Sequence, residues 1–323
     1  MKTILPVILI TLLCMSLVQC KKDNKTPMIQ SGATQEAHDV HSFAQPDKAV
    51  ITHLSLDLAI DFDQKKISGT ATYDIKEAPA ADSIIFDTRD LDITKVTVDG
   101  AEVAFTLGTT KEWLGQALSI PLQAGSKKVE ITYATRPGAE ALQWLEPSQT
   151  AGKKFPYLFT QGQAILTRTW IPIQDSPGIR LTYDARITVP KDLMAVMSAT
   201  NPQTKNAEGV YTFKMDQPIP GYLIALAVGD IEFRPIGDRT GVYSEPSVVD
   251  KAAAEFVDMQ KMVEAAEALY GPYKWERYDV IVLPPSFPFG GMENPRLTFA
   301  TPTILAGDKS LVALIAHEVA HSW

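Results

Sequence analysis

The chain has 323 residues, of which 45% are hydrophobic, and this composition excludes a disordered polymer and suffices for roughly two folded domains. Its formal net charge is -8 and its isoelectric point is near 5.2, without a cluster of Lys and Arg. A nucleic-acid partner is therefore not expected, because binding to phosphates needs a basic surface.

The first 20 residues, MKTILPVILITLLCMSLVQC, have the layout of a secretory signal peptide. One Lys precedes an apolar run from Ile4 to Val18, which is shorter than a membrane-spanning helix. The residues leading to Cys20 resemble a bacterial lipoprotein cleavage box, although Gln19 stands where a small residue is usual. The alternative is that Cys20 is an ordinary leader cysteine. We expect export to the bacterial periplasm or cell envelope. The only membrane attachment that we expect is a lipid anchor at Cys20.

Residues 21–45 are polar and without periodicity, and we interpret them as a flexible linker. Residues 46–236 then alternate apolar and polar side chains, as in HLSLDLAIDF, where Leu54, Leu56 and Leu58 share one face. Further runs of this kind are ITKVTVDG, KKVEITYAT, RLTYDARITVP and GYLIALAVGDIEF. The pattern predicts an amino-terminal antiparallel β-domain.

Residues 237–323 have the pattern of a mixed α/β domain. Residues 247–270 follow Pro246, end at Gly271 and space apolar side chains at helical intervals, which predicts one helix. The run RYDVIVLPP predicts a strand, and the chain closes with a second predicted helix in SLVALIAHEVAHSW. We therefore predict a multidomain α+β protein.

The last helix contains the pattern His-Glu-x-x-His. His317 and His321 are four residues apart, so both imidazoles lie on one face and can converge on a metal ion. Zinc suits imidazole ligands and keeps one position open for water in catalytic sites. Glu318 would then take a proton from that water as a general base. The alternative is that the two histidines are hydrogen-bonded side chains on a buried helix. That alternative would not explain why a Glu stands at position 318.

The segment GGMEN, Gly290 to Asn294, is a second candidate for substrate binding. Gly290 and Gly291 allow another backbone to approach closely, and Glu293 offers a carboxylate to the free ammonium of a peptide. Taken alone, the segment is more typical of a glycine turn with a surface glutamate. Ahead of a zinc-binding helix, it favours an aminopeptidase.

GGMEN followed by HEVAH resembles the zinc aminopeptidases of the aminopeptidase N family. Within that family, the segments TQGQAILTR, PIPGYLIALAVG and LPPSFPFGGMENP resemble the leukotriene A-4 hydrolase branch and its bacterial aminopeptidase relatives. The resemblance runs from about residue 50 to the end and implies a thermolysin-like catalytic domain. It also implies one zinc ion with the ligands His317 and His321, Glu318 as general base and Glu293 as the group that binds the substrate amine.

The same resemblance implies further contacts with the substrate. The implied residues are Gln161, Gly162 and Gln163, with the Gln163 amide near the substrate amine, and a cleft lined by Pro288, Phe289, Gly290, Gly291 and Met292. Phe289 stands where Tyr is usual in the family, so a hydrogen bond of the first side-chain pocket is not expected here.

The family pattern places a Glu as third zinc ligand and an oxyanion-stabilising Tyr beyond the second histidine, and neither lies within these 323 residues. We expect this chain to be part of a longer enzyme and to be inactive by itself. The expected function is removal of the N-terminal residue from short peptides. Two alternatives remain: an aminopeptidase that also hydrolyses a lipid epoxide, and a non-catalytic peptide-binding module. The presence of both HEVAH and GGMEN argues against the module.

Overall fold

The computed structural model describes residues 39–79 and 81–323. The predicted signal peptide and most of the predicted linker lie outside these residues. The described residues belong to one compact unit. Within the described part of the chain, no helix is long and apolar enough to cross a lipid bilayer.

The largest sheet among the described residues has seven strands in the order β13-β11-β1-β2-β8-β4-β5. They are β1 (Ala49–Asp61), β2 (Lys66–Glu77), β4 (Leu91–Val98), β5 (Ala101–Glu102), β8 (Lys128–Thr135), β11 (Arg180–Thr188) and β13 (Val210–Pro220). Leu54, Leu56 and Leu58 are buried on one face, as the alternation predicted.

One strand pair of this sheet differs from the prediction. β1 and β11 run parallel, whereas every other neighbouring pair described in the sheet is antiparallel. The predicted antiparallel domain is therefore wrong at this pair. A parallel partner needs a long connection, and the residues between β1 and β11 supply one by passing through two other sheets.

Those two sheets complete the β-rich part of the chain. The first contains β3 (Ser83–Thr88), β7 (Gln116–Pro121) and β6 (Thr106–Leu107), in that spatial order. The second has the spatial order β12 (Met194–Met197), β14 (Leu226–Gly229), β10 (Tyr157–Thr160) and β9 (Leu142–Leu145). β10, β12 and β14 are buried along their whole length, so they lack the two-residue alternation of β1.

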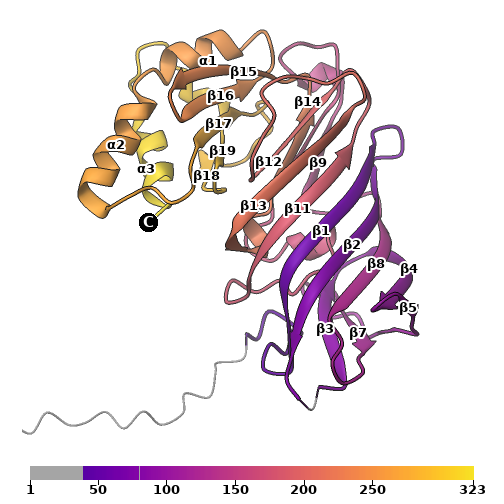
Figure 1. Cartoon of the computed structure of the whole chain (residues 1–323). Helices are drawn as coiled ribbons and strands as arrows, with labels where there is room; N and C mark the ends of the chain where they lie inside the picture. Colours follow the sequence, from indigo (N-terminus) through magenta and orange to yellow (C-terminus); the bar gives the residue numbers. More distant parts are fainter. Residues whose placement is uncertain (1–38, 80) are drawn as a thin grey trace, which may run out of the picture. The chain divides into compact units, whose positions relative to one another are not determined.

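The carboxyl-terminal part, coloured orange to yellow in Figure 1, has a mixed sheet with helices beside it. Its strands are β15 (Glu232–Gly237), β16 (Thr240–Ser244), β17 (Tyr278–Val282), β19 (Leu297–Ala300) and β18 (Gly291–Met292), in that spatial order. Its helices are α1 (Val249–Glu255), α2 (Met259–Tyr270) and α3 (Ala313–Ala320). Short 3-10 helices cover Pro147–Gln149, Thr167–Thr169, Gly221–Leu223 and Pro302–Ile304. The predicted domain boundary between residues 236 and 237 falls inside β15.

The predicted helix over residues 247–270 is two helices in the structure, so this prediction is corrected. α1 ends at Glu255 and α2 begins at Met259. The carboxylate of Glu255 accepts hydrogen bonds from the backbone N–H groups of Gly307 and Lys309, at 2.9 and 2.8 Å. Phe256 and Met259 on either side of the break are both buried, so the apolar spacing did not reveal it.

The last residues of the predicted linker are fastened to the β-rich part. Ser42 donates its hydroxyl proton to a carboxylate oxygen of Asp87 at 2.6 Å, and the backbone N–H of Phe43 donates to the other oxygen at 2.6 Å. Ala44 is buried beside them. The folded unit therefore already includes residues 42–44.

Candidate active site

Helix α3 presents the two histidines of the His-Glu-x-x-His pattern on one exposed side. Ile315 and Val319 are buried and fix the orientation of the helix. The Nε2 atoms of His317 and His321 lie 3.2 Å apart, and their ring centroids are 4.8 Å apart. The structure therefore brings together the two nitrogens that the spacing predicted would converge.

Glu318 lies on the buried side of α3, with 4% of its surface exposed. Its Oε2 atom is buried and has no hydrogen-bond partner among the described residues. Burial raises the pKa of Glu318 to about 7, and the negative charge of Glu293 adds to this rise. A carboxyl with this pKa can both accept and release a proton near neutral pH.

Gly291 and Met292 of the GGMEN segment form β18, the edge strand next to β19. Gly291 pairs with Ala300 in antiparallel register, and the carbonyl of Gly290 accepts a hydrogen bond from Thr301 N at 3.0 Å. The strand passes directly over Glu318. A Cβ atom at Gly291 would lie 2.2 Å from Glu318 Oε1, so this position must lack a side chain for the carboxylate to lie where it does.

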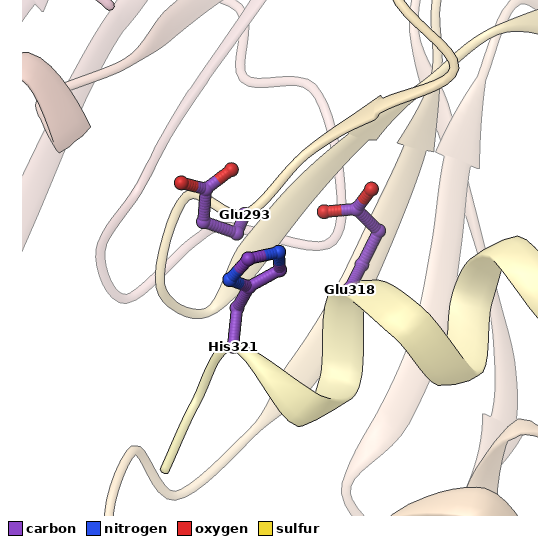
Figure 2. Close-up of side chains that lie close together, drawn as sticks. All are labelled: Glu293, Glu318 and His321. Atoms are coloured by element: carbon purple, nitrogen blue, oxygen red, sulfur yellow. The ribbon is translucent and has the colours of Figure 1, made fainter.

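Glu293, at the end of β18, completes the cluster. Figure 2 shows its side chain close to Glu318 of α3 and to His321, which follows the helix directly. One ligand atom from each of these three residues lies within 4.8 Å of the other two. Imidazole nitrogen and carboxylate oxygen are both zinc ligands, and the orphaned buried oxygen of Glu318 is a further sign that a polar group belongs there. The residues present therefore fit a divalent cation.

The predicted substrate-contacting segment has one buried and one exposed glutamine. Gln161, the residue after β10, is buried, and its Nε2 donates to Sδ of Met292 in β18 at 3.3 Å. At Gly162 a Cβ atom would lie 2.7 Å from the carbonyl oxygen of Tyr222. Gln163 is exposed and lines a cavity of about 320 Å³ together with Tyr222.

The cleft residues that precede β18 are exposed. Pro288, Phe289 and Gly290 all lie at the surface, and the Phe289 ring packs edge to face against Phe287 at 6.0 Å between centroids. Met292 is the buried member of the predicted cleft.

Two residues near the cluster were not singled out from the sequence. Tyr222 is one of them: burial raises the pKa of its phenol, and the charge of Glu293 raises it further. The sequence did contain a signal for Tyr222, because this residue lies within the segment PIPGYLIALAVG, which resembles the family. The other is Leu314, whose methyl groups lie 3.4 and 3.5 Å from where a Cβ atom of Gly290 would stand. Its helical position alone did not distinguish it from core leucines.

Comparison with known protein families agrees with this arrangement. The model of the Peptidase M1 N-terminal domain matches residues 50–223, and the model of the Peptidase family M1 domain matches residues 254–323. The chain belongs to the M1 peptidase family. The predicted resemblance is therefore confirmed, and so is the predicted order of a β-rich amino-terminal domain followed by the start of a catalytic domain.

Similar proteins of this M1 chain include leukotriene A-4 hydrolase of Xenopus laevis, with 46% identity over 88% of the chain and 49% of the relative. Leucine aminopeptidase 2 of Yarrowia lipolytica is 45% identical over 84% of the chain and 42% of the relative. The structure of yeast LTA4 hydrolase in complex with bestatin superposes with a TM-score of 0.84 and 36% identity, over 90% of this chain and 46% of that one. The chain thus spans about half the length of the relatives it matches.

Proposed function

We propose that this chain supplies the metal-binding helix and the amine-binding carboxylate of a zinc aminopeptidase that acts on short peptides. Two observations carry the proposal: His317 and His321 bring their Nε2 atoms to 3.2 Å, and His321 lies in one cluster of ligand atoms with Glu318 and Glu293. Membership in the M1 family supports it, as does the similarity to leucine aminopeptidase 2.

His317 and His321 would hold the zinc ion, and a third protein ligand, a Glu, is expected from outside residues 1–323. When bound at these residues, zinc would supply a Lewis acid for polarising a peptide carbonyl and making water more acidic. Glu318 then accepts a proton through its Oε2 atom, which lacks a partner in the described structure.

The peptide would be bound beside β18. As the edge strand of the mixed sheet, β18 has one side unpaired in the described structure, and an extended peptide can add there by backbone hydrogen bonds. Glu293 follows directly and would pair with the terminal ammonium of that peptide. This pairing selects for a free amino terminus and makes the enzyme an exopeptidase.

The test is metal content and turnover in the full-length protein. We expect His321→Ala to lose zinc stoichiometry, because it removes a ligand, whereas His53→Ala, a histidine of the seven-stranded sheet, should retain it. Glu318→Gln should keep zinc and lose about 10²- to 10⁴-fold in turnover, because an amide accepts no proton. Full zinc in His321→Ala would refute the metal site, and parental turnover in Glu318→Gln would place the base elsewhere.

We also propose that the protein is exported and carries a lipid on Cys20. The support is the apolar leader and the cleavage-box pattern, both outside the described residues. In a bacterial host, Cys20→Ala should move the protein from the membrane fraction to the soluble fraction. Cys14→Ala is the matched control and should stay with membranes. An equal distribution of the two variants would reject the anchor.

A further inference from the structure

A second cavity lies where the loop between β6 and β7 meets the end of β3. Its volume is about 380 Å³, within the range of small-ligand sites. The lining residues used below are Arg89, Asp90, Glu112, Trp113, Gln116 and Glu140. All of them differ from the residues of the candidate active site, so the proposed peptidase chemistry does not account for this cavity.

Trp113 stands at the tip of this loop with 67% of its surface exposed. Its φ angle is +66°, and the N–H of Leu114 donates to the carbonyl of Glu112 at 2.8 Å around it. This is the γ-turn form with positive φ, which is rare and strained. Lys111 and Gly115 exchange backbone hydrogen bonds of 2.8 and 2.9 Å and close the turn.

Two arginine side chains form hydrogen bonds to the strained turn. Nη1 of the fully buried Arg168 donates to the carbonyl of Leu114 at 3.0 Å, and Nη1 of Arg89 donates to the carbonyl of Trp113 at 3.5 Å. Single exposed aromatic residues are ordinary on protein surfaces. A bulky residue held in a disfavoured conformation by its surroundings is a different observation, because such strain concentrates at functional sites. The indole is therefore pre-positioned at the cavity.

Planar polar side chains line the cavity, and the lining contains both positively and negatively charged residues. Arg89 and Glu140 form a two-pronged pair, with Nη1 to Oε2 at 3.2 Å, so their donors and acceptors have fixed directions. Asp90, Glu112 and Gln116 add further acceptors. Three carboxylates and the two cations Arg89 and Lys111 nearly cancel, so the cavity does not select a strongly charged ligand.

We propose that this cavity binds a neutral oligosaccharide, with one pyranose ring stacked on Trp113. The C–H face of a sugar ring is apolar and matches a flat exposed indole. Neighbouring ring hydroxyls both donate and accept, which matches the fixed pair of Arg89 and Glu140. The site is independent of the peptidase site and would bind glycan whether or not the protein is loaded with metal.

The experiment is calorimetric titration of the purified protein with cellotetraose and chitotetraose. We expect millimolar binding of at least one sugar. Trp113→Ala should weaken it about tenfold, because the stacking surface is lost. Trp113→Phe keeps a flat ring and should retain most of the affinity. Leu269→Ala is the control, an exposed apolar side chain on α2, and should bind as the parent does.

Three outcomes would overturn the proposal: no heat with either sugar up to roughly 10 mM, equal affinity in the parent and Trp113→Ala, or binding of inorganic phosphate in preference to both sugars. If Trp113→Ala fails to fold, Glu140→Gln removes a hydrogen-bonding charge from an exposed side chain and tests the same cavity. Peptidase turnover should be unchanged in every cavity variant, which separates this site from the proposed active site.

Discussion

Gly291 and Glu318 belong to different elements, β18 and α3, and meet where a side chain on the strand would collide with the carboxylate. Gly291→Ala would put a Cβ atom 2.2 Å from Oε1, so we expect the carboxylate to move. A displacement of about 1 Å can cost 10²-fold in rate, and we expect a loss of that order in kcat/KM with zinc content retained. Gly178→Ala, whose Cβ would meet Ser176 Oγ at 3.9 Å, should be neutral. Parental kcat/KM in Gly291→Ala would show that the carboxylate tolerates the shift.

At the same scale, the proposed function makes Glu293 the residue that requires a free amino terminus. A contact of its carboxylate with a terminal ammonium would be charge-assisted and worth about 1.5 to 3 kcal/mol, or roughly ten- to hundredfold in rate. The full-length protein should therefore cleave an unblocked alanyl anilide and ignore its N-acetyl counterpart. Glu293→Gln should lose most of this discrimination and much of the activity, whereas Glu264→Gln on α2 should keep both. Equal rates on the free and acetylated substrates would indicate an endopeptidase instead.

At the scale of elements, the sequence predicted the helix that carries the histidines and the strand β17, because both depend on local spacing. The His-Glu-x-x-His pattern is itself helical, so His317, Glu318 and His321 could be chosen without a structure. The break between α1 and α2 could not be predicted from local spacing, and the last residue of α1, Glu255, makes its contacts about fifty residues away, in the loop before α3. The course of β18 over Glu318 is equally non-local.

Glu255 should therefore stabilise the loop that leads into α3. Its carboxylate is 5% exposed and accepts from two backbone N–H groups, those of Gly307 and Lys309. Glu255→Ala leaves these donors without the carboxylate, so we expect a loss of about 1 to 3 kcal/mol in the free energy of unfolding. Glu208→Ala, at an exposed position, serves as control in the same urea titration. A loss as small as that of the control would show that the loop is held by other contacts.

For the whole molecule, alternation predicted the half-buried strands of the large sheet but not the arrangement of the sheets. β10, β12 and β14 are buried on both faces and carry no alternation that a sequence pattern can detect. The parallel pairing of β1 with β11 and the contact of Gln161 with Met292 join residues more than a hundred positions apart. Only the family resemblance, and not the residue pattern, brought Gln161 to notice.

Arg168 ties distant segments of the folded unit together. It is fully buried, and its guanidinium donates to Asp175 Oδ2 at 3.1 Å and to the carbonyls of His41 and Leu114 at 2.8 and 3.0 Å. Arg168→Met would leave the Asp175 charge uncompensated in the interior. We expect a loss of about 3 to 5 kcal/mol in the free energy of unfolding. Arg186→Met removes a half-exposed partner of Asp57 and should cost at most about 1 kcal/mol.

The loss in Arg168→Met should also depend on pH. Burial raises the pKa of Asp175 to about 6 even with Arg168 present, and removal of the guanidinium raises it further. A carboxyl whose folded pKa lies above its unfolded value favours the fold while it is protonated, and this contribution is lost as the pH rises through the folded pKa. The variant retains the proton to higher pH than the parent, so its deficit should be smaller at pH 5 than at pH 8. Urea titrations of both proteins at these two pH values measure the difference, and equal deficits would mean that removal of Arg168 leaves the pKa of Asp175 unchanged.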